Sequence, residues 1–164
     1  MKIKFKKLSE NATIPTLNHP TDAGLDLFAA EEMWLDPYVE DVGQIQNIIH
    51  LKKPQTLVPT DIAWEPTDIP ESYKVVGIIK ETSGNAYKLG LKIGAGVVDQ
   101  NYRGPIGVVV YNFSNDQVVI KKGAKIGQLV PMLIPIFEVE EVDEVSETDR
   151  GSKGFGSSGM ATGA

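Results

Sequence analysis

Residues 98–106, "VDQNYRGPI", hold the side chains with the clearest chemical potential in this sequence. Asp99 follows two valines and precedes Gln, Asn and Gly residues typical of a tight hairpin turn, so we expect its carboxylate to be anchored. Gly94 and Gly96 stand just before it, and a backbone without side chains can approach a ligand closely and pair with the edge of a base. The structural alternatives are an Asp99 side chain bonded to its own loop and a Tyr102 ring packed on the turn.

Other polar residues lie within apolar surroundings or at the start of a helix. Asp26 interrupts the apolar run "GLDLFAA", where a carboxylate must face solvent, a partner or a metal ion. Ser83 and Gly84 stand at the start of a predicted helix, an arrangement that either binds an anion or caps the helix. Gln128 lies in a strand that is otherwise apolar, where its primary amide needs hydrogen-bond partners.

The chain ends on the glycine-rich segment "RGSKGFGSSGMATGA", residues 150–164. Ordering glycine costs more conformational entropy than ordering any other residue, and such a segment is ordinarily a flexible tail. The functional alternative is that its amides wrap an anion, while Arg150 supplies a forked cation and Phe155 a flat face for a base. The segment alone leaves both interpretations open.

Composition excludes several classes of function. The 164 residues contain no cysteine and two histidines, so disulfides, a thiol nucleophile and a cysteine-ligated zinc are excluded. The formal net charge of −6 disfavours nucleic acid as a partner, and if the ligand is a polyanion, we expect it to be small and to arrive with a divalent cation. With no long apolar run and no signal-peptide core, we expect no membrane partner and a soluble, cytoplasmic protein.

Short β-rich runs separated by Pro, Gly and Asp/Asn clusters dominate the chain, and they predict an all-β sandwich or barrel of the jelly-roll type. The expected strands lie within residues 2–8, 24–30, 55–64, 73–80, 106–114, 117–123 and 125–142. The one short helix is expected over residues 83–90, capped by Ser83 or Asn85 and ended by Gly90. We expect one β core over residues 1–140, followed by a C-terminal arm over residues 141–164.

Five ordered blocks cover nearly the whole chain, and together they resemble the trimeric dUTPase family. The blocks are "AGLDLFAA", "ETSGNA", "GAGVVDQNYRG", "GAKIGQLV" and "RGSKGFGSSG". The third and the fifth are specific, because long strings agree with the family in residue type and spacing. The segment "NATIPTLNHPTDAG" is similar to bacteriophage and Gram-positive members.

The resemblance implies a jelly-roll homotrimer whose three active sites lie at subunit interfaces, each closed by the C-terminal arm of a neighbour. It implies Mg²⁺-dependent hydrolysis of dUTP to dUMP and pyrophosphate by attack of water on the α-phosphorus. That activity keeps uracil out of DNA and supplies dUMP for dTMP synthesis. An arm ordered only with ligand can act as a lid over the site.

The resemblance also assigns roles to residues. Asp99 positions and deprotonates the attacking water, and Asp26 contacts a metal-bound water. The 94–99 backbone pairs with uracil, Tyr102 packs against the sugar and excludes a 2′-hydroxyl, and Phe155 stacks on the base. The substrate-binding residues implied are Ser83, Gly84, Gly94, Gly96, Val98, Tyr102, Gln128, Arg150, Phe155, Gly156, Ser157 and Ser158.

Three departures from the family pattern concern charge and length. Thr82 stands where the family has Arg, so we expect weaker phosphate stabilisation unless a lysine compensates. The candidates for that lysine are Lys80, Lys88 and Lys153. Ala124 and Lys125 replace an Asp-Arg pair, so an ion pair there is lost or rebuilt. The 33–55 stretch is longer than usual.

Two alternatives remain beside dUTP hydrolysis. One is a dCTP deaminase-like enzyme of the same superfamily, disfavoured by "VVDQNYRG" and the Gly-rich arm. The other is a nucleotide-binding trimer that acts mainly as a protein-interaction module, which Thr82 and the long 33–55 stretch favour.

Overall fold

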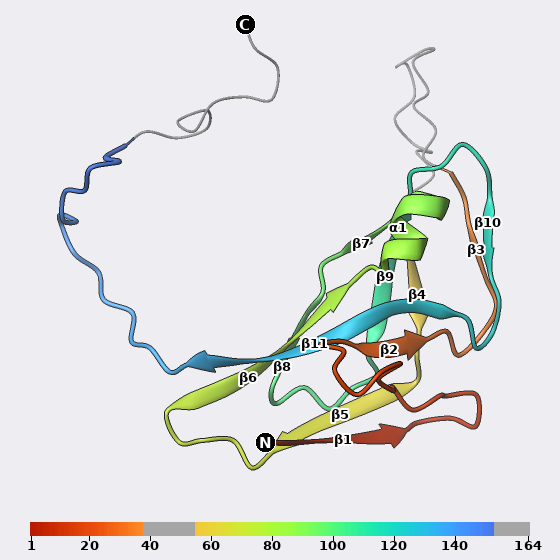
Figure 1. The fold of residues 1–164 in the computed structure, drawn as a ribbon, viewed down its shortest axis with the longest axis horizontal. Helices are drawn as coiled ribbons and strands as arrows, with labels where there is room; N and C mark the ends of the chain where they lie inside the picture. The colour runs from red at the N-terminus through yellow and green to blue at the C-terminus, as the bar shows by residue number, and fades with distance from the viewer. Residues whose placement is uncertain (38–54, 153–164) are drawn as a thin grey trace, which may run out of the picture.

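A computed structural model describes residues 1–37 and 55–152 of the chain. Within these residues the fold is all-β, as the sequence predicts, with one short helix (Figure 1). The strands are β1 (Lys2–Lys7), β2 (Leu25–Phe28), β3 (Met33–Leu35), β4 (Gln55–Pro59), β5 (Ile62–Thr67), β6 (Tyr73–Lys80), β7 (Leu91–Gly94), β8 (Val97–Asp99), β9 (Gly107–Asn112), β10 (Val118–Ile120) and β11 (Lys125–Pro135), and the helix is α1 (Ser83–Leu89).

The strands form two larger sheets and two ribbons. One sheet has the order β2-β11-β6-β8 and the other the order β4-β9-β7, while β1 pairs with β5 and β3 with β10. Every pairing is antiparallel, and most neighbours are distant in the sequence. β11 therefore pairs with β2, near the start of the chain, and with β6, near its middle.

Strict alternation of side chains explains how the two larger sheets face each other. In β9 the buried residues Val108 and Val110 alternate with half-buried ones, and in β6 Val75 and Ile79 are buried at the same period. These side chains belong to one apolar cluster with Leu129 of β11. The core therefore lies between the four-stranded and the three-stranded sheet.

The connection from β7 to β8 carries the chain from one sheet to the other. Gly96 has a φ of 97°, and a Cβ there would lie 2.8 Å from the carbonyl oxygen of Ile79, so only glycine fits. The predicted turn after Asp99 is present, since the Tyr102 amide donates to the Asp99 carbonyl at 3.1 Å. The predicted hairpin is wrong, because β8 pairs with β6 while β9 pairs with β4 and β7.

The helix and the strand ends differ from the sequence prediction in detail. Thr82, rather than Ser83 or Asn85, is the N-cap, and its hydroxyl accepts a hydrogen bond from the Asn85 amide at 3.3 Å. Gly90 ends the helix in the left-handed conformation, as predicted. β11 stops at Pro135, and the described residues after it run away from the sheets (Figure 1).

The long 33–55 stretch contains the unpredicted strand β3 at its start, and its residues 38–54 lie outside the described part of the chain. Among the described residues, no helix has the length and apolar character needed to cross a lipid bilayer.

Asn112 is a buried polar residue that ties β9 to the end of β3. Its side chain is fully buried, and its amide group donates to the carbonyls of Leu35 at 3.0 Å and Asp116 at 2.8 Å. Its carbonyl oxygen accepts from the amide and the hydroxyl of Ser114. The side chain is therefore fully satisfied in a dry position.

Replacing Asn112 with aspartate keeps the shape of the side chain but removes both donors and buries a charge. We expect the free energy of unfolding to fall by about 3 kcal/mol, measured by urea denaturation at fixed protein concentration. Asn18→Asp on the exposed N-terminal loop is the control, with an expected change below about 0.5 kcal/mol. Equal losses in the two variants would contradict this role of Asn112.

Candidate active site

A row of polar side chains crosses the four-stranded sheet on the face opposite the core. Asp26 of β2 is paired with Gln128 of β11, which is paired with Lys80 of β6. Directly opposed residues in an antiparallel sheet share a face, so these three side chains form a row. Their sequence neighbours Leu27 and Leu129 point into the core.

A β-bulge adds Lys125 to this row. The register of β11 against β2 shifts between Lys125 and Gly127, so that Lys125 is opposite Phe28. With the extra residue, Lys125 and Gln128 lie on one face, although regular alternation would separate them. Lys125 Nζ lies 2.5 Å from Asp26 Oδ2, and Asp26 is only 8% exposed. The ion pair that the sequence left open as lost or rebuilt is therefore rebuilt between Lys125 and Asp26.

The start of α1 is bonded to the same row. Asn85 Nδ2 donates to the carbonyl of Lys125 at 3.1 Å, and Gln128 Nε2 donates to the carbonyl of Glu81 at 3.3 Å. Ser83 and Gly84 are exposed beside these contacts. The structure thus brings together four of the predicted site residues, which are Asp26, Ser83, Gly84 and Gln128.

Sequence reasoning missed a second ion pair beside this row. Lys92 of β7 donates to Glu81 Oε1, while Glu81 Oε2 is buried without a hydrogen-bond partner among the described residues. The hydrogen bond from Lys92 lowers the pKa of the Glu81 carboxyl, against the opposing effect of its burial. The signal available in the sequence was a lone lysine in the apolar run "LKIG".

Asp99 lies on a turn whose backbone is fixed while its carboxylate is not. Its carbonyl accepts hydrogen bonds from Trp64 Nε1 at 3.2 Å and from the Tyr102 amide at 3.1 Å. Arg103 Nη1 closes the turn by donating to the Gln100 carbonyl at 2.7 Å. The Asp99 side chain is exposed and makes no hydrogen bond within the described part of the chain, so the self-bonded alternative is wrong.

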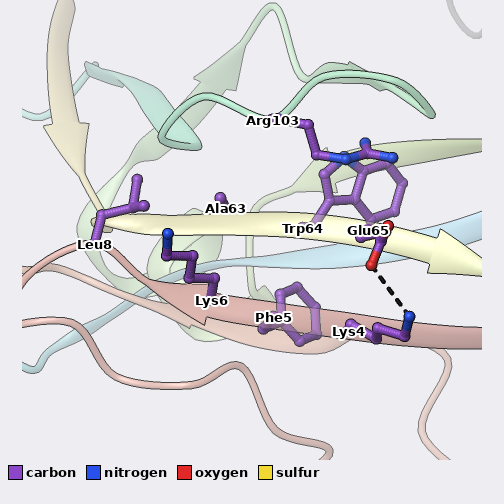
Figure 2. Close-up of a pocket in the computed structure, with 8 residues that line it drawn as sticks. All are labelled: Lys4, Phe5, Lys6, Leu8, Ala63, Trp64, Glu65 and Arg103. Atoms are coloured by element: carbon purple, nitrogen blue, oxygen red, sulfur yellow. Dashed lines mark hydrogen bonds and ion pairs between the residues drawn. The ribbon is translucent and has the colours of Figure 1, made fainter.

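Hollows lie on two sides of this turn. One of about 460 Å³ is lined by Asp99 together with Lys74 and Val97. Figure 2 shows another, of about 490 Å³, where Trp64 and Arg103 line the wall opposite the β1 side chains. Trp64 therefore supports the Asp99 turn from one side through its hydrogen bond, and Asp99 lines the first hollow.

The glycines before Asp99 have roles within the fold. The ring of Tyr111 lies against Gly94 where a Cβ would otherwise be, and Val98 is buried in the core. Tyr102 stays half-exposed, with its hydroxyl donating to the Pro105 carbonyl at 3.0 Å. Backbone pairing of Gly94, Gly96 and Val98 with a base stays a prediction.

A single chain leaves the predicted site in separate parts. Asp99 of β8 is opposite Val76 of β6, whereas Asp26 of β2 is in line with Lys80 of β6. The two aspartates are therefore three strand spacings apart across the sheet, and apart along the strands by the distance from Val76 to Lys80. With about 4.8 Å between strands and about 3.3 Å per residue, the two carboxylates stand on the order of 20 Å apart. Arg150 lies on the segment beyond β11, and Phe155, Gly156, Ser157 and Ser158 are outside the described residues.

Known proteins share this fold and this sequence. A model of the dUTPase family matches residues 10–159. The human mitochondrial deoxyuridine 5′-triphosphate nucleotidohydrolase is 37% identical, over 97% of this chain and 55% of the relative. The enzyme of that name from Gloeothece citriformis is 38% identical, over 99% of both chains. The Staphylococcus bacteriophage 80alpha dUTPase with dUPNHPP is 32% identical, with a TM-score of 0.77, over 97% of this chain and 99% of that one.

These matches define an all-β protein with the jelly-roll-like fold, as the sequence predicts. The chain belongs to the dUTPase family, and its similarity includes the phage members. It spans about half the length of the human relative, 55%, and nearly all of the relative from Gloeothece citriformis, 99%.

Acid should weaken the contribution of Glu81 to stability. Because the folded pKa of Glu81 lies below its ordinary value of 4.5, its contribution is complete above that value and is lost as the pH falls through the folded pKa. We expect Glu81→Gln to be less stable than the parent at neutral pH, with a difference that shrinks below pH 4.5 in urea denaturation.

Glu65→Gln is the matched control, because Glu65 pairs with Lys4 at 3.2 Å on the exposed surface. An exposed pair contributes little, so this variant should follow the parent at every pH. A Glu81→Gln deficit that stays constant from neutral to acid pH would exclude the ionised pair as its cause.

Proposed function

We propose that this protein hydrolyses dUTP to dUMP and pyrophosphate, and that this keeps uracil out of DNA and supplies dUMP. Family membership makes the chain a dUTP diphosphatase, and its relatives bear the name deoxyuridine 5′-triphosphate nucleotidohydrolase. The observation that carries the proposal is the exposed carboxylate of Asp99 on a turn fixed by Trp64. A cytoplasmic location is part of the same proposal.

Asp99 would act as the general base. Its carboxylate orients a water molecule and takes its proton while the oxygen attacks the α-phosphorus and the bond to pyrophosphate breaks. A fixed backbone with an unbonded side chain supports this role, since the geometry is preset while the carboxylate stays available. Much of the rate enhancement then comes from placement and from neutralised phosphate charge.

Mg²⁺ fits the groups around Asp26. The described residues contain no cluster of three or more His, Cys, Asp or Glu side chains, so the protein offers single carboxylates and not a cage. Mg²⁺ retains waters and is often bound by substrate phosphates with one carboxylate nearby. Asp26 would contact a metal-bound water, and the ion would supply neutralisation of the phosphate charge.

Base and sugar selection would fall to the 94–99 turn and Tyr102. Backbone groups of residues 94–96, where Ala95 carries the one small side chain, would pair with the edge of uracil and leave the amino group of cytosine unmatched. The Tyr102 ring is held by its bond to the Pro105 carbonyl, so it can exclude a 2′-hydroxyl.

A homotrimer would assemble the parts that one chain separates. The face of the three-stranded sheet away from the core exposes Leu57 to 62%, beside the stacked rings of Tyr111 and Phe113 at 6.0 Å. Such an apolar face favours contact with other copies. The proposed organisation is a β core over residues 1–140 and an arm over residues 141–164, which closes the site of a neighbour.

An assay of the parent with Mg²⁺ tests the reaction. We expect pyrophosphate from dUTP and little from dCTP, dTTP or UTP. Asp99→Asn should bind dUTP with unchanged affinity and hydrolyse it at least about a hundredfold more slowly, because an amide cannot accept the proton. Asp116→Asn makes the same change at an exposed aspartate away from this turn and should keep the parental rate.

Other products would point to the alternatives. Ammonia released from dCTP would indicate a deaminase, and nucleotide binding with neither product would indicate an interaction module. Full activity of Asp99→Asn would remove Asp99 from the reaction.

Mixing two inactive variants tests whether subunits share a site. One is Asp99→Asn, and the other is a chain truncated after Asp149, which lacks the arm from Arg150 onward. If Asp99 and the arm come from different subunits, chains denatured together and refolded should regain about a quarter of parental activity, as random assembly dictates. Either variant refolded alone should stay inactive, and no recovery in the mixture would show that one chain supplies both.

A further inference from the structure

The ion pair between Asp26 and Lys125 conflicts with the role proposed for Asp26. A carboxylate that contacts a metal-bound water has to offer an oxygen to it, yet Asp26 Oδ2 lies 2.5 Å from Lys125 Nζ. The side chain of Asp26 is 11% exposed and that of Lys125 is 40% exposed. The lysine is therefore the partner that can leave, because its side chain is much more exposed than that of the aspartate.

The cations of this region are lysines. The sequence has two arginines, Arg103 and Arg150, and neither lies in the polar row. Thr82 caps α1 and supplies no charge. A triphosphate on this face would therefore meet Lys80 and Lys125, which the register of β6, β11 and β2 places on the same side as Gln128.

The backbone of Lys125 is fixed while its side chain is not. Asn85 Nδ2 holds its carbonyl at 3.1 Å, and the bulge at Gly127 sets the direction of its side chain. Lysine carries a compact charge with three donors on a flexible stem, so it can change partners without a movement of the main chain. Only the ammonium group has to move.

We propose that Lys125 exchanges Asp26 for the triphosphate of the nucleotide, and that this exchange frees the Asp26 carboxylate for the metal-bound water. The inference rests on the proposed function. Without ligand, the pair compensates a carboxylate that would otherwise be buried with its charge unmatched. A polyphosphate is the stronger partner for the ammonium group, and Mg²⁺ then compensates the carboxylate. Binding of triphosphate and of metal thus become mutually dependent.

Lys125→Met tests the lysine directly, since it keeps the stem and removes the charge. Binding of dUpNHpp and of deoxyuridine is measured by calorimetry at constant ionic strength, with and without Mg²⁺. We expect about tenfold weaker binding of dUpNHpp and unchanged binding of deoxyuridine, because only the former carries phosphates. Lys121→Met is the matched control, since Lys121 pairs with Glu32 at 2.8 Å on the exposed surface; it should bind both compounds as the parent does.

The direction in which Asp26→Asn changes the affinity for dUpNHpp decides between an exchanging pair and a structural one. Without Mg²⁺, this variant should bind dUpNHpp several-fold more tightly than the parent, because Lys125 no longer has to leave a carboxylate. With Mg²⁺ that advantage should disappear, since the asparagine cannot accept the metal-bound water in the same way. Thermal unfolding of both variants establishes that they are folded.

Weaker metal-free binding of dUpNHpp by Asp26→Asn would overturn the exchange and leave the pair as structural. The same holds if Lys125→Met weakens binding of deoxyuridine and of dUpNHpp equally. Failure of the proposed function is separate: it would show as a parent protein that neither binds dUpNHpp nor releases pyrophosphate from dUTP.

Discussion

The position of β11 between β2 and β6 is the constraint on which the rest of the structure depends. Its alternation sends Leu129 into the core and Gln128 to the opposite face, so one strand both stabilises the fold and carries the polar row. The bulge after Lys125 breaks that alternation once, and it does so where a cation has to reach Asp26. Burial of the apolar face thus fixes the register, and the register fixes which charges meet.

The same sheet also separates the two carboxylates proposed for the reaction and for the metal-bound water. β8 is on the far side of β6 from β11 and β2, so Asp99 belongs to a different part of the surface from Asp26. A sheet is too stiff to bring these carboxylates together by local motion, because each is part of a hydrogen-bonded ladder and the core lies beneath. In the proposed homotrimer, different subunits would supply the two carboxylates without distorting either ladder, and activity would then depend on assembly.

Sequence patterns predicted the features that depend on residues close together in the chain. The β-rich runs, the end of α1 at Gly90 and the family blocks were readable, because alternation and glycine conformations are local properties. Pairing partners were not: the turn after Asp99 looked like a hairpin, yet β8 and β9 join different sheets through contacts distant in the sequence. The contacts between Lys125 and Asp26 and between Lys92 and Glu81 depend on register across strands, which residue order does not contain.

The paired charges also show how the surface proposed to bind phosphate is compensated in the absence of a ligand. Lysines gathered for phosphate would repel each other in an empty site, and a buried carboxylate alone would be costly. Pairing Lys125 with Asp26 and Lys92 with Glu81 compensates these charges in the absence of a ligand. In the proposed site, Lys125 would meet the phosphates after leaving an existing ion pair, whereas Lys80 would meet them directly. Under the proposed exchange, ligand affinity would depend on how readily Lys125 leaves Asp26, and less on the number of positive charges on the surface.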